Sequence, residues 1–180
     1  MAAFDRAFDI VVLGTEKGYQ NDPDDPGNWT GGAVNQGRLR GTNFGISAAS
    51  YPTLDIAQLT EADARAIYRR DYWDHVQGDA LPAPLALLVF DAAVNNGTGQ
   101  AARWLQRAVG VEADGQIGPE TLAAVQRQGT IPDGGWHLCA GFMALRMQFM
   151  AGLPTWRSFG AGWSLRLARL PWQAMTMAQA

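Results

Sequence analysis

Acidic side chains gather in one short stretch near the N-terminus, where they could carry out acid–base chemistry. Residues 5–25 hold five Asp and one Glu. The glutamate is Glu16, and the loop that follows it contains Asp22, Asp24 and Asp25. A carboxylic acid that donates a proton, paired with a second carboxylate, is the usual machinery for cleaving a glycosidic bond. The stretch predicts a polysaccharide-cleaving site, and the alternative interpretation is a polar surface loop after a first helix.

The element that must position Glu16 is a helix at the start of the chain. Apolar residues recur there at helical spacing, so residues 3–15 are predicted to form a helix with one buried face. Gly14 and Gly18 bracket its end, where glycine lets a chain leave a helix at little cost. We expect partial burial and the helix dipole to raise the pKa of Glu16 and keep it protonated, as a general acid requires.

The loop after Glu16 has no periodic pattern. Its D-P-D-D-P-G run is strong turn chemistry, because Pro fixes φ and Gly accepts positive φ. Scattered apolar residues among glycines are consistent with a small β-hairpin or a packed irregular loop. Trp29 could stack on the face of a sugar or cover the core, and the sequence leaves both open.

Most of the remaining chain is predicted to be helical. Thr60 and Asp63 resemble a capping box at the start of one helix, and an almost entirely apolar segment after Pro84 predicts a central buried helix. These two helices cover residues 61–73 and 85–94. Further helices are predicted at residues 101–109, 119–128 and 136–150, followed by a last short helix packed by Trp156, Phe159 and Trp163. Residues after Pro171 carry no strong signal and are expected to fray.

Two reactive side chains in these helices are interpreted as structural. Asp91 interrupts the apolar run, and a buried Asp must be hydrogen-bonded, for which Asn95 one turn later is the candidate partner. A structural role is favoured over a catalytic one. Cys139 is predicted to be an inert buried thiol. It belongs to a helical stripe that is predicted to face the core, formed by Trp136, Cys139, Ala140, Met143, Met147 and Met150.

Composition excludes several classes of protein. The 180 residues suit one compact unit or two small lobes, and a net charge of −3 gives no general case for nucleic-acid binding. One Cys and two isolated His predict no disulfide, metal or cofactor. The sequence shows neither a signal peptide nor a membrane span. A basic C-terminal face could meet an acidic polymer or be a solvated helix face; its residues are Arg146, Arg157, Arg166 and Arg169.

The stretch T-E-K-G-Y-Q-N-D-P-D-D-P-G, with the later G-T-N-F-G-I-S, resembles the bacterial and phage N-acetylmuramidases of glycoside hydrolase family 108. That family carries an E-G-G-Y motif near the N-terminus, in which the Glu is the catalytic acid. Here the motif begins at Glu16 and ends at Tyr19, with Lys17 in place of one glycine. The resemblance implies that Glu16 is the catalytic acid, while the backbone at Lys17 need not adopt a glycine-only conformation.

The resemblance continues over roughly residues 5–165. The segment F-D-A-A-V-N-N-G-T-G-Q-A-A-R-W-L-Q-R-A-V-G, with D-G-Q-I-G-P-E-T-L, looks like the peptidoglycan-binding domain predicted behind that catalytic domain. It implies a catalytic domain over residues 1–82 and a helical peptidoglycan-binding-like domain over residues 83–180, packed against it. The implied fold is mainly α, a lysozyme-like α+β arrangement with a small β-hairpin near residues 28–46 beside the active-site cleft.

A looser resemblance to the phage lysozymes suggests the partners of Glu16. Those enzymes space a Glu, then an Asp after eight intervening residues, then a Thr, and eight residues separate Glu16 from Asp25. Thr42 is preferred to Thr30 because G-T-N-F-G-I matches the family's own pattern better. Asp22 and Asp24 remain rivals for the second carboxylate, or turn-capping residues. The predicted substrate-binding residues are Tyr19, Asp22, Trp29 and Asn43.

The resemblance implies a monomeric peptidoglycan hydrolase that cleaves the β-1,4 bond between N-acetylmuramic acid and N-acetylglucosamine. It would be made in the cytoplasm without a signal peptide and reach the cell wall through a holin or a secretion system. Retaining and inverting routes stay open, because they differ in a carboxyl separation that sequence does not supply. Two alternatives also stay open: a peptidoglycan-binding module without catalysis, and a lytic transglycosylase on a similar fold.

Overall fold

The computed structural model describes residues 2–14, 18–130 and 133–177. The chain divides into two compact units, one formed by Phe8–Arg69 and the other by Met1–Ala7 together with Arg70–Ala180. Helices dominate, and a single two-stranded antiparallel sheet is present in the part of the chain that is described. The expected mainly α fold with a small β-hairpin is confirmed.

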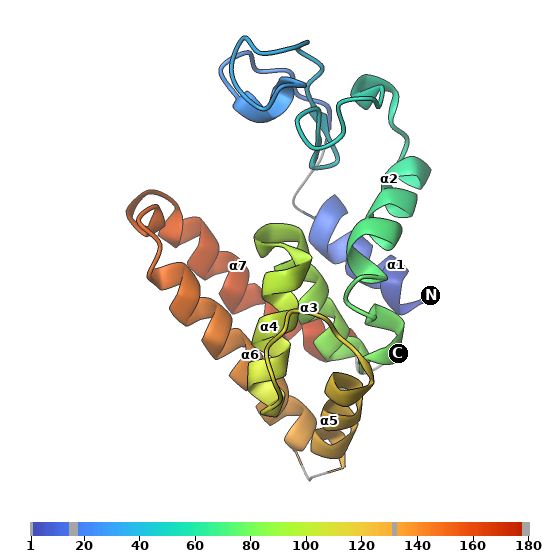
Figure 1. Cartoon of the computed structure of the whole chain (residues 1–180), viewed down its shortest axis with the longest axis vertical. Helices are drawn as coiled ribbons and strands as arrows, with labels where there is room; N and C mark the ends of the chain where they lie inside the picture. Colours follow the sequence, from blue (N-terminus) through green and yellow to red (C-terminus); the bar gives the residue numbers. More distant parts are fainter. Residues whose placement is uncertain (1, 15–17, 131–132, 178–180) are drawn as a thin grey trace. The chain divides into compact units, whose positions relative to one another are not determined.

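Helix α3 (Ala83–Asn96) is the centre of the larger unit, as its apolar sequence predicts. Every side chain from Leu85 to Ala93 is buried. Around it pack three helices (Figure 1), α4 (Thr98–Val109), α6 (Gly134–Ala151) and α7 (Trp156–Met177), while α5 (Pro119–Gly129) packs on α4 and α6. An apolar helix buried on all sides is the expected solution when neighbouring helices supply the surrounding surface.

Two helix predictions in this unit are wrong. The last helix is not short, because α7 runs for 22 residues through Pro171, and Leu170, Ala174 and Met177 are buried along it. Packing of these apolar side chains offsets the hydrogen bond that a proline removes inside a helix. In α6 the predicted core stripe is only half correct, since Trp136 is 44% exposed and Met147 is 47% exposed. That helix is apolar on nearly every face, so periodicity could not choose the buried one.

The N-terminal helix ties the start of the chain into an aromatic cluster. The ring of Phe4 lies edge-on to Trp73 at 5.5 Å and to Phe90 at 6.1 Å, and Trp73 meets Phe90 at 5.5 Å. The single helix predicted over residues 3–15 is an α-helix, α1 (Ala3–Phe8), that continues as a π-helical turn, η1 (Asp9–Leu13). Clustered edge-to-face rings of this kind add to the stability gained by burial alone.

The smaller unit is organised around helix α2 (Glu61–Tyr68), which continues as the π-helical turn η4 (Arg69–Trp73). Thr60 and Asp63 form the predicted capping box, which is confirmed. The ring of Phe8 packs edge-on against Tyr68 at 5.6 Å, and the Arg65 guanidinium lies 4.4 Å from the centre of the Phe8 ring. These contacts join residues that lie far apart in the sequence into one small core.

The β-hairpin lies at the end of the range predicted for it. Strands β1 (Thr42–Asn43) and β2 (Ile46–Ser47) are joined by Phe44 and Gly45, both at positive φ, as a type I′ turn requires. Residues 28–40 contribute only an isolated bridge, between Trp29 and Leu39. Short 3-10 turns complete the fold: η2 (Pro26–Asn28), η3 (Ile56–Gln58) and η5 (Gly78–Ala80). Among the described residues, no helix is long and apolar enough to cross a membrane.

Candidate active site

Asn28 is the centre of the loop that carries the predicted catalytic residues. It is fully buried. Its side-chain oxygen accepts hydrogen bonds from the Thr42 hydroxyl at 2.8 Å and from Gln20 Nε2 at 3.0 Å. Its amide nitrogen donates to Gln20 Oε1 at 2.8 Å and to the Asp22 carbonyl at 2.9 Å. A buried amide whose donors and acceptors are all used fixes its partners in place.

The predicted second carboxylate, Asp25, joins the same group. Its Oδ2 accepts a hydrogen bond from Gln20 Nε2 at 3.1 Å, and its Oδ1 accepts one from the Gly27 backbone N–H at 2.8 Å. Asp25 is thus also the N-cap of η2. We call Gln20, Asp25, Asn28 and Thr42 the loop network. It brings Asp25 and Thr42, which lie 17 residues apart in the sequence, into one connected set of side chains.

Backbone pairing holds the two ends of the loop network together. Gln20 and Thr42 exchange two backbone hydrogen bonds of 2.9 Å each. The ring of Tyr19 lies against Gly41, where a Cβ atom would come within 2.6 Å of the ring and 2.4 Å of the Gln20 carbonyl oxygen. Gly41 also has φ +81°. Only glycine fits this close approach, so the loop geometry depends on Gly41.

The side chains of the rivals of Asp25 and Thr42 form no hydrogen bond with the loop network among the described residues. Asp22 caps a turn, since its carboxylate accepts a hydrogen bond from the Asp24 backbone N–H at 3.0 Å, and both aspartates are exposed. Thr30 lies in the arm formed by residues 29–39, where its hydroxyl accepts a hydrogen bond from the Arg38 backbone N–H at 2.9 Å. Turn capping by Asp22 is one of the three roles that the sequence leaves open for it, beside second carboxylate and substrate-binding residue.

The other predicted substrate-binding residues differ in how much side-chain surface they leave accessible to a ligand. Tyr19 is 44% exposed. Trp29 is half-buried, and its indole N–H donates to the Pro23 carbonyl at 2.9 Å, so only its ring surface can meet a ligand. Asn43 is 7% exposed, and its amide donates to the carbonyls of Ile56 and Leu59, each at 3.3 Å. Of these three, Tyr19 offers the most surface.

Glu16, like Lys17, lies outside the described residues. The structure does describe the chain on either side. Helical structure ends at Leu13, where the Gly14 N–H bonds to the Asp9 carbonyl at 2.9 Å, and the chain is described again from Gly18, which has φ +90°. Thr15, the last residue of the predicted helix, lies outside the described residues.

Two residues of the loop network were not predicted from the sequence. Gln20 and Asn28 carry neutral amides, which a search for acids, bases and metal ligands passes over. Asn28 belongs to the D-P-D-D-P-G-N run, where turn chemistry explains every polar residue equally well. Their role becomes visible only when the backbone pairing of Gln20 with Thr42 is known.

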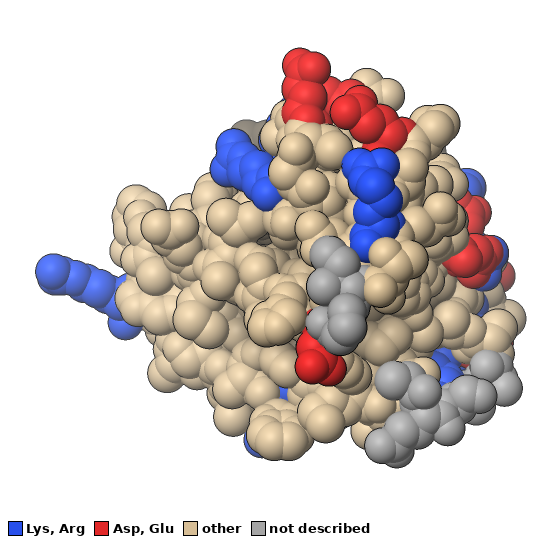
Figure 2. Space-filling model, turned by 90° about the horizontal axis from the view of Figure 1, so that it is seen from below, with Lys and Arg blue, Asp and Glu red and all other residues tan. Residues whose placement is uncertain are grey.

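The predicted basic C-terminal face needs a correction. Arg146 is fully buried, and its Nη1 donates to Asp91 Oδ2 at 2.5 Å. Arg166 donates to Asp91 Oδ1 from Nε at 2.8 Å and from Nη2 at 2.6 Å. The predicted structural role of Asp91 agrees with these contacts. Asn95, its predicted partner, instead bonds to the Asp91 backbone carbonyl at 2.7 Å. On the face of the molecule shown in Figure 2, charged side chains of both signs are scattered over a mainly uncharged surface.

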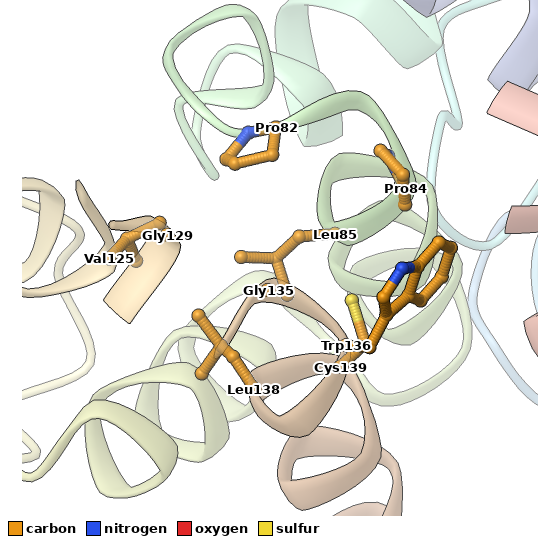
Figure 3. A pocket seen from close by; sticks show the side chains of 9 residues that line it. All are labelled: Pro82, Pro84, Leu85, Val125, Gly129, Gly135, Trp136, Leu138 and Cys139. Carbon is orange, nitrogen blue, oxygen red and sulfur yellow. The ribbon is translucent and has the colours of Figure 1, made fainter. Parts of the chain in front are cut away.

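An apolar pocket of about 210 Å³ opens beside the start of α3 (Figure 3). Pro82, Pro84 and Leu85 line one side, and Trp136, Leu138 and Cys139 of α6 line another. Burial raises the pKa of the Cys139 thiol to about 11, so at neutral pH it is protonated and a poor nucleophile. The predicted buried thiol is confirmed.

No group of three or more His, Cys, Asp or Glu within residues 2–14, 18–130 and 133–177 is arranged to hold a metal ion.

Comparison with known proteins agrees with the fold. The chain is similar to a solved structure of SagA from Brucella abortus, with 31% sequence identity over 98% of this chain and 96% of that one and a TM-score of 0.78. Residues 10–97 match the glycosyl hydrolase 108 family, and residues 100–168 match the predicted peptidoglycan domain. No curated protein sequence matches the chain.

These matches define a glycoside hydrolase that carries a peptidoglycan domain. The chain belongs to the glycosyl hydrolase 108 family, and peptidoglycan is its substrate class. The family match includes the whole loop network.

Proposed function

We propose that the protein is an N-acetylmuramidase that cleaves the β-1,4 bond between N-acetylmuramic acid and N-acetylglucosamine. The observation that carries this proposal is the loop network, because it joins Asp25 to Thr42 through Gln20 and Asn28 in the segment that follows Glu16. A carboxylate and a hydroxyl that belong to one hydrogen-bonded set are what the step after proton donation needs in such a reaction.

Glu16 would donate its proton to the leaving glycosidic oxygen. Asp25 would stabilise the oxocarbenium-like transition state or position the attacking water, and the Thr42 hydroxyl would help to orient that water. The hydrogen bonds that Asp25 accepts come from a backbone N–H and a neutral amide, and no cation among the described residues cancels its negative charge. An uncancelled carboxylate suits a role opposite a developing positive charge.

The substrate would lie against Tyr19 and the ring of Trp29. Aromatic rings offer apolar surface to the C–H face of a sugar, and both side chains retain exposed area. Asp22 and Asn43 would add polar contacts at the edges of the site. Asn43 would contribute only the side-chain atoms that are not used in its hydrogen bonds to Ile56 and Leu59.

The division of labour we propose is a catalytic domain over residues 1–82 and a wall-binding domain over residues 83–180. The protein would act as a monomer on the glycan strands of the cell wall, with a holin or a secretion system delivering it. A phage endolysin and a factor for remodelling the host wall both fit this description.

The test is hydrolysis of purified peptidoglycan by the full chain, measured as release of reducing ends. Glu16→Gln removes the proton donor and is expected to slow release by roughly 100- to 10,000-fold. Glu112→Gln is the matched control, because Glu112 is exposed and lies in the other unit. Full activity in Glu16→Gln would overturn the assignment of the acid.

The products separate the muramidase from its two rivals. Mass spectrometry should find muramic acid with a free reducing end. Anhydro-muramic products would identify a lytic transglycosylase, and sedimentation of the wild-type protein with peptidoglycan without product release would identify a binding module. The anomeric form of the first product, read by NMR, distinguishes retaining from inverting hydrolysis.

A further inference from the structure

A buried group of charges in the larger unit is incompletely neutralised. Asp91 is 1% exposed and accepts hydrogen bonds from both Arg146 and Arg166, so two guanidinium groups share one carboxylate. The three side chains together carry one net positive charge. Coulomb repulsion from Arg166 and, above all, burial lower the pKa of Arg146, although an arginine stays protonated at neutral pH.

One donor of this group has no partner. Arg146 is fully buried; its Nε donates to Asn96 Oδ1 at 3.1 Å and its Nη1 to Asp91, but Nη2 bonds to nothing among the described residues. An unpaired buried donor destabilises the folded state, and the cost in free energy is larger when the donor belongs to a charged group than when it belongs to a neutral one. An acceptor that also carries negative charge would remove both the missing bond and the excess charge.

Arg146 also lines a pocket. It measures about 240 Å³, and both Arg146 and Arg166 line it. Asn95, Asn96 and Thr155 add polar atoms, whereas Met150, Leu153, Trp163 and Leu167 form an apolar wall. The volume is below that of pockets for drug-sized ligands, which measure roughly 300–1,000 Å³. The pocket therefore suits a small group with an anionic end and a short apolar side. We call it the arginine pocket.

We propose that the arginine pocket binds the terminal carboxylate of a peptide, with Arg146 Nη2 donating to a carboxylate oxygen and the apolar wall receiving a small side chain. This rests on the proposed function, because peptidoglycan supplies such ends: its stem peptides finish in a small amino acid with a free carboxylate. The planar guanidinium matches a carboxylate in geometry as well as in charge. A water molecule would supply the missing acceptor but would leave the positive charge uncompensated.

The probe is N-acetyl-D-alanine, titrated into the full wild-type chain at constant ionic strength and followed by calorimetry and by NMR of the arginine Nε–H and tryptophan indole signals. N-acetyl-D-alaninamide is the matched ligand without the charge, and sodium acetate is the matched ligand without the amino-acid body. We expect saturable binding of N-acetyl-D-alanine that shifts the signals of Arg146, Arg166 and Trp163, weaker binding of acetate, and no binding of the amide.

Two variants locate the site. Arg146→Lys keeps the charge opposite Asp91 but removes Nη2. Thr155→Asp places a carboxylate at an exposed lining position and keeps the buried charges intact, so it remains informative if Arg146→Lys does not fold. Each is expected to weaken binding of the probe roughly tenfold or more. Ser158→Asp adds the same charge at an exposed position outside the pocket lining and should leave binding unchanged.

Three results would overturn the proposal: no saturable binding of N-acetyl-D-alanine, equal binding of the amide, or undiminished binding by Thr155→Asp. Equal affinity for acetate would overturn the assignment to a peptide end. None of these measurements involves glycan cleavage, so a failure here is distinguishable from a failure of the proposed muramidase activity.

Discussion

The two units hold their key aspartates in opposite ways. In the smaller unit, Asp25 is half-buried and accepts hydrogen bonds from a backbone N–H and the amide of Gln20. In the larger unit, Asp91 is 1% exposed and is held by two guanidinium groups. Neutral donors fix the position of a carboxylate and leave its charge available, whereas guanidinium groups cancel the charge and anchor helices to one another.

This difference separates a site suited to chemistry from a site suited to structure. A carboxylate that must respond to a developing positive charge cannot already be neutralised. A carboxylate inside an apolar helix must be neutralised, because an unpaired buried charge costs several kcal/mol. The same residue type therefore has its role set by its donors, and mutations should affect the two aspartates in different ways.

The largest effect on stability is expected at Asp91. Asp91→Asn leaves the buried Arg146 without its counter-charge and should lower the free energy of unfolding by about 3–5 kcal/mol. Urea denaturation at neutral pH measures this change. Asp133→Asn, at an exposed position in the same unit, is the matched control and should change stability little. Equal effects of the two substitutions would remove the basis of the comparison.

Asp25→Asn should give the reverse pattern. Asn caps a helical turn about as well as Asp, so stability should be nearly unchanged. Hydrolysis of peptidoglycan should fall sharply, because the proposed role of Asp25 depends on its charge. A variant that loses stability but keeps its activity would assign Asp25 to structure alone.

Removing the centre of the loop network should have the next largest effect. Asn28→Ala takes four side-chain hydrogen bonds from a buried position: Gln20 loses two of its bonds, and the Thr42 hydroxyl and the Asp22 carbonyl each lose one. We expect a loss of about 2–3 kcal/mol, measured by thermal or urea denaturation. Asn35→Ala, on the exposed arm, gives the comparison for an amide outside the loop network, although its positive φ adds a small cost.

Gly41→Ala tests whether the loop network depends on backbone geometry. The added Cβ would meet the Gln20 carbonyl oxygen at 2.4 Å, and φ at this position is +81°. The expected cost is about 1–3 kcal/mol, accompanied by a loss of hydrolysis as Gln20 and Thr42 separate. Gly32→Ala also has a positive φ of 75° but meets no atom within 4 Å, so it isolates the contribution of the backbone angle. Equal losses of stability and of hydrolysis in the two variants would show that the loop network does not depend on the close approach at Gly41.

The smallest effect is expected at the capping box of α2, and it should depend on pH. The hydrogen bond from the Thr60 hydroxyl is the main cause that lowers the pKa of Asp63. A lowered folded-state pKa contributes stability that is present above the unfolded value of about 4 and is lost as pH falls through the folded value. Thr60→Ala should cost about 0.5–2 kcal/mol at pH 7. Urea titrations should show the difference from wild type shrinking toward pH 2.

The sequence predicted what depends on local rules. Thr60 and Asp63 mark a helix start wherever they occur, and the apolar run around Leu85 could only be buried. It did not predict that Arg146 and Arg166 meet Asp91, because partners 55 and 75 residues away are chosen by tertiary packing. A basic residue on a helix looks the same in a sequence whether it faces water or a buried acid.

The residue types of the candidate site could be predicted from the sequence, but the hydrogen bonds that connect these residues could not. Asp25 and Thr42 could be selected from spacing and resemblance, but the amides that join them have no charge pattern to reveal them. Asn28 is visible as a turn residue and becomes the buried centre only because Gln20 and Thr42 pair across the loop.

The division of the chain also sets an order of assembly during synthesis. The larger unit combines Met1–Ala7 with Arg70–Ala180, and within it the Arg6 guanidinium donates to the Thr176 carbonyl at 2.8 Å. On the ribosome, Arg6 emerges 170 residues ahead of its acceptor. The smaller unit needs only residues 8–69 and can close early, at a low cost in loop entropy. Completion of the larger unit must wait until α7 has been translated.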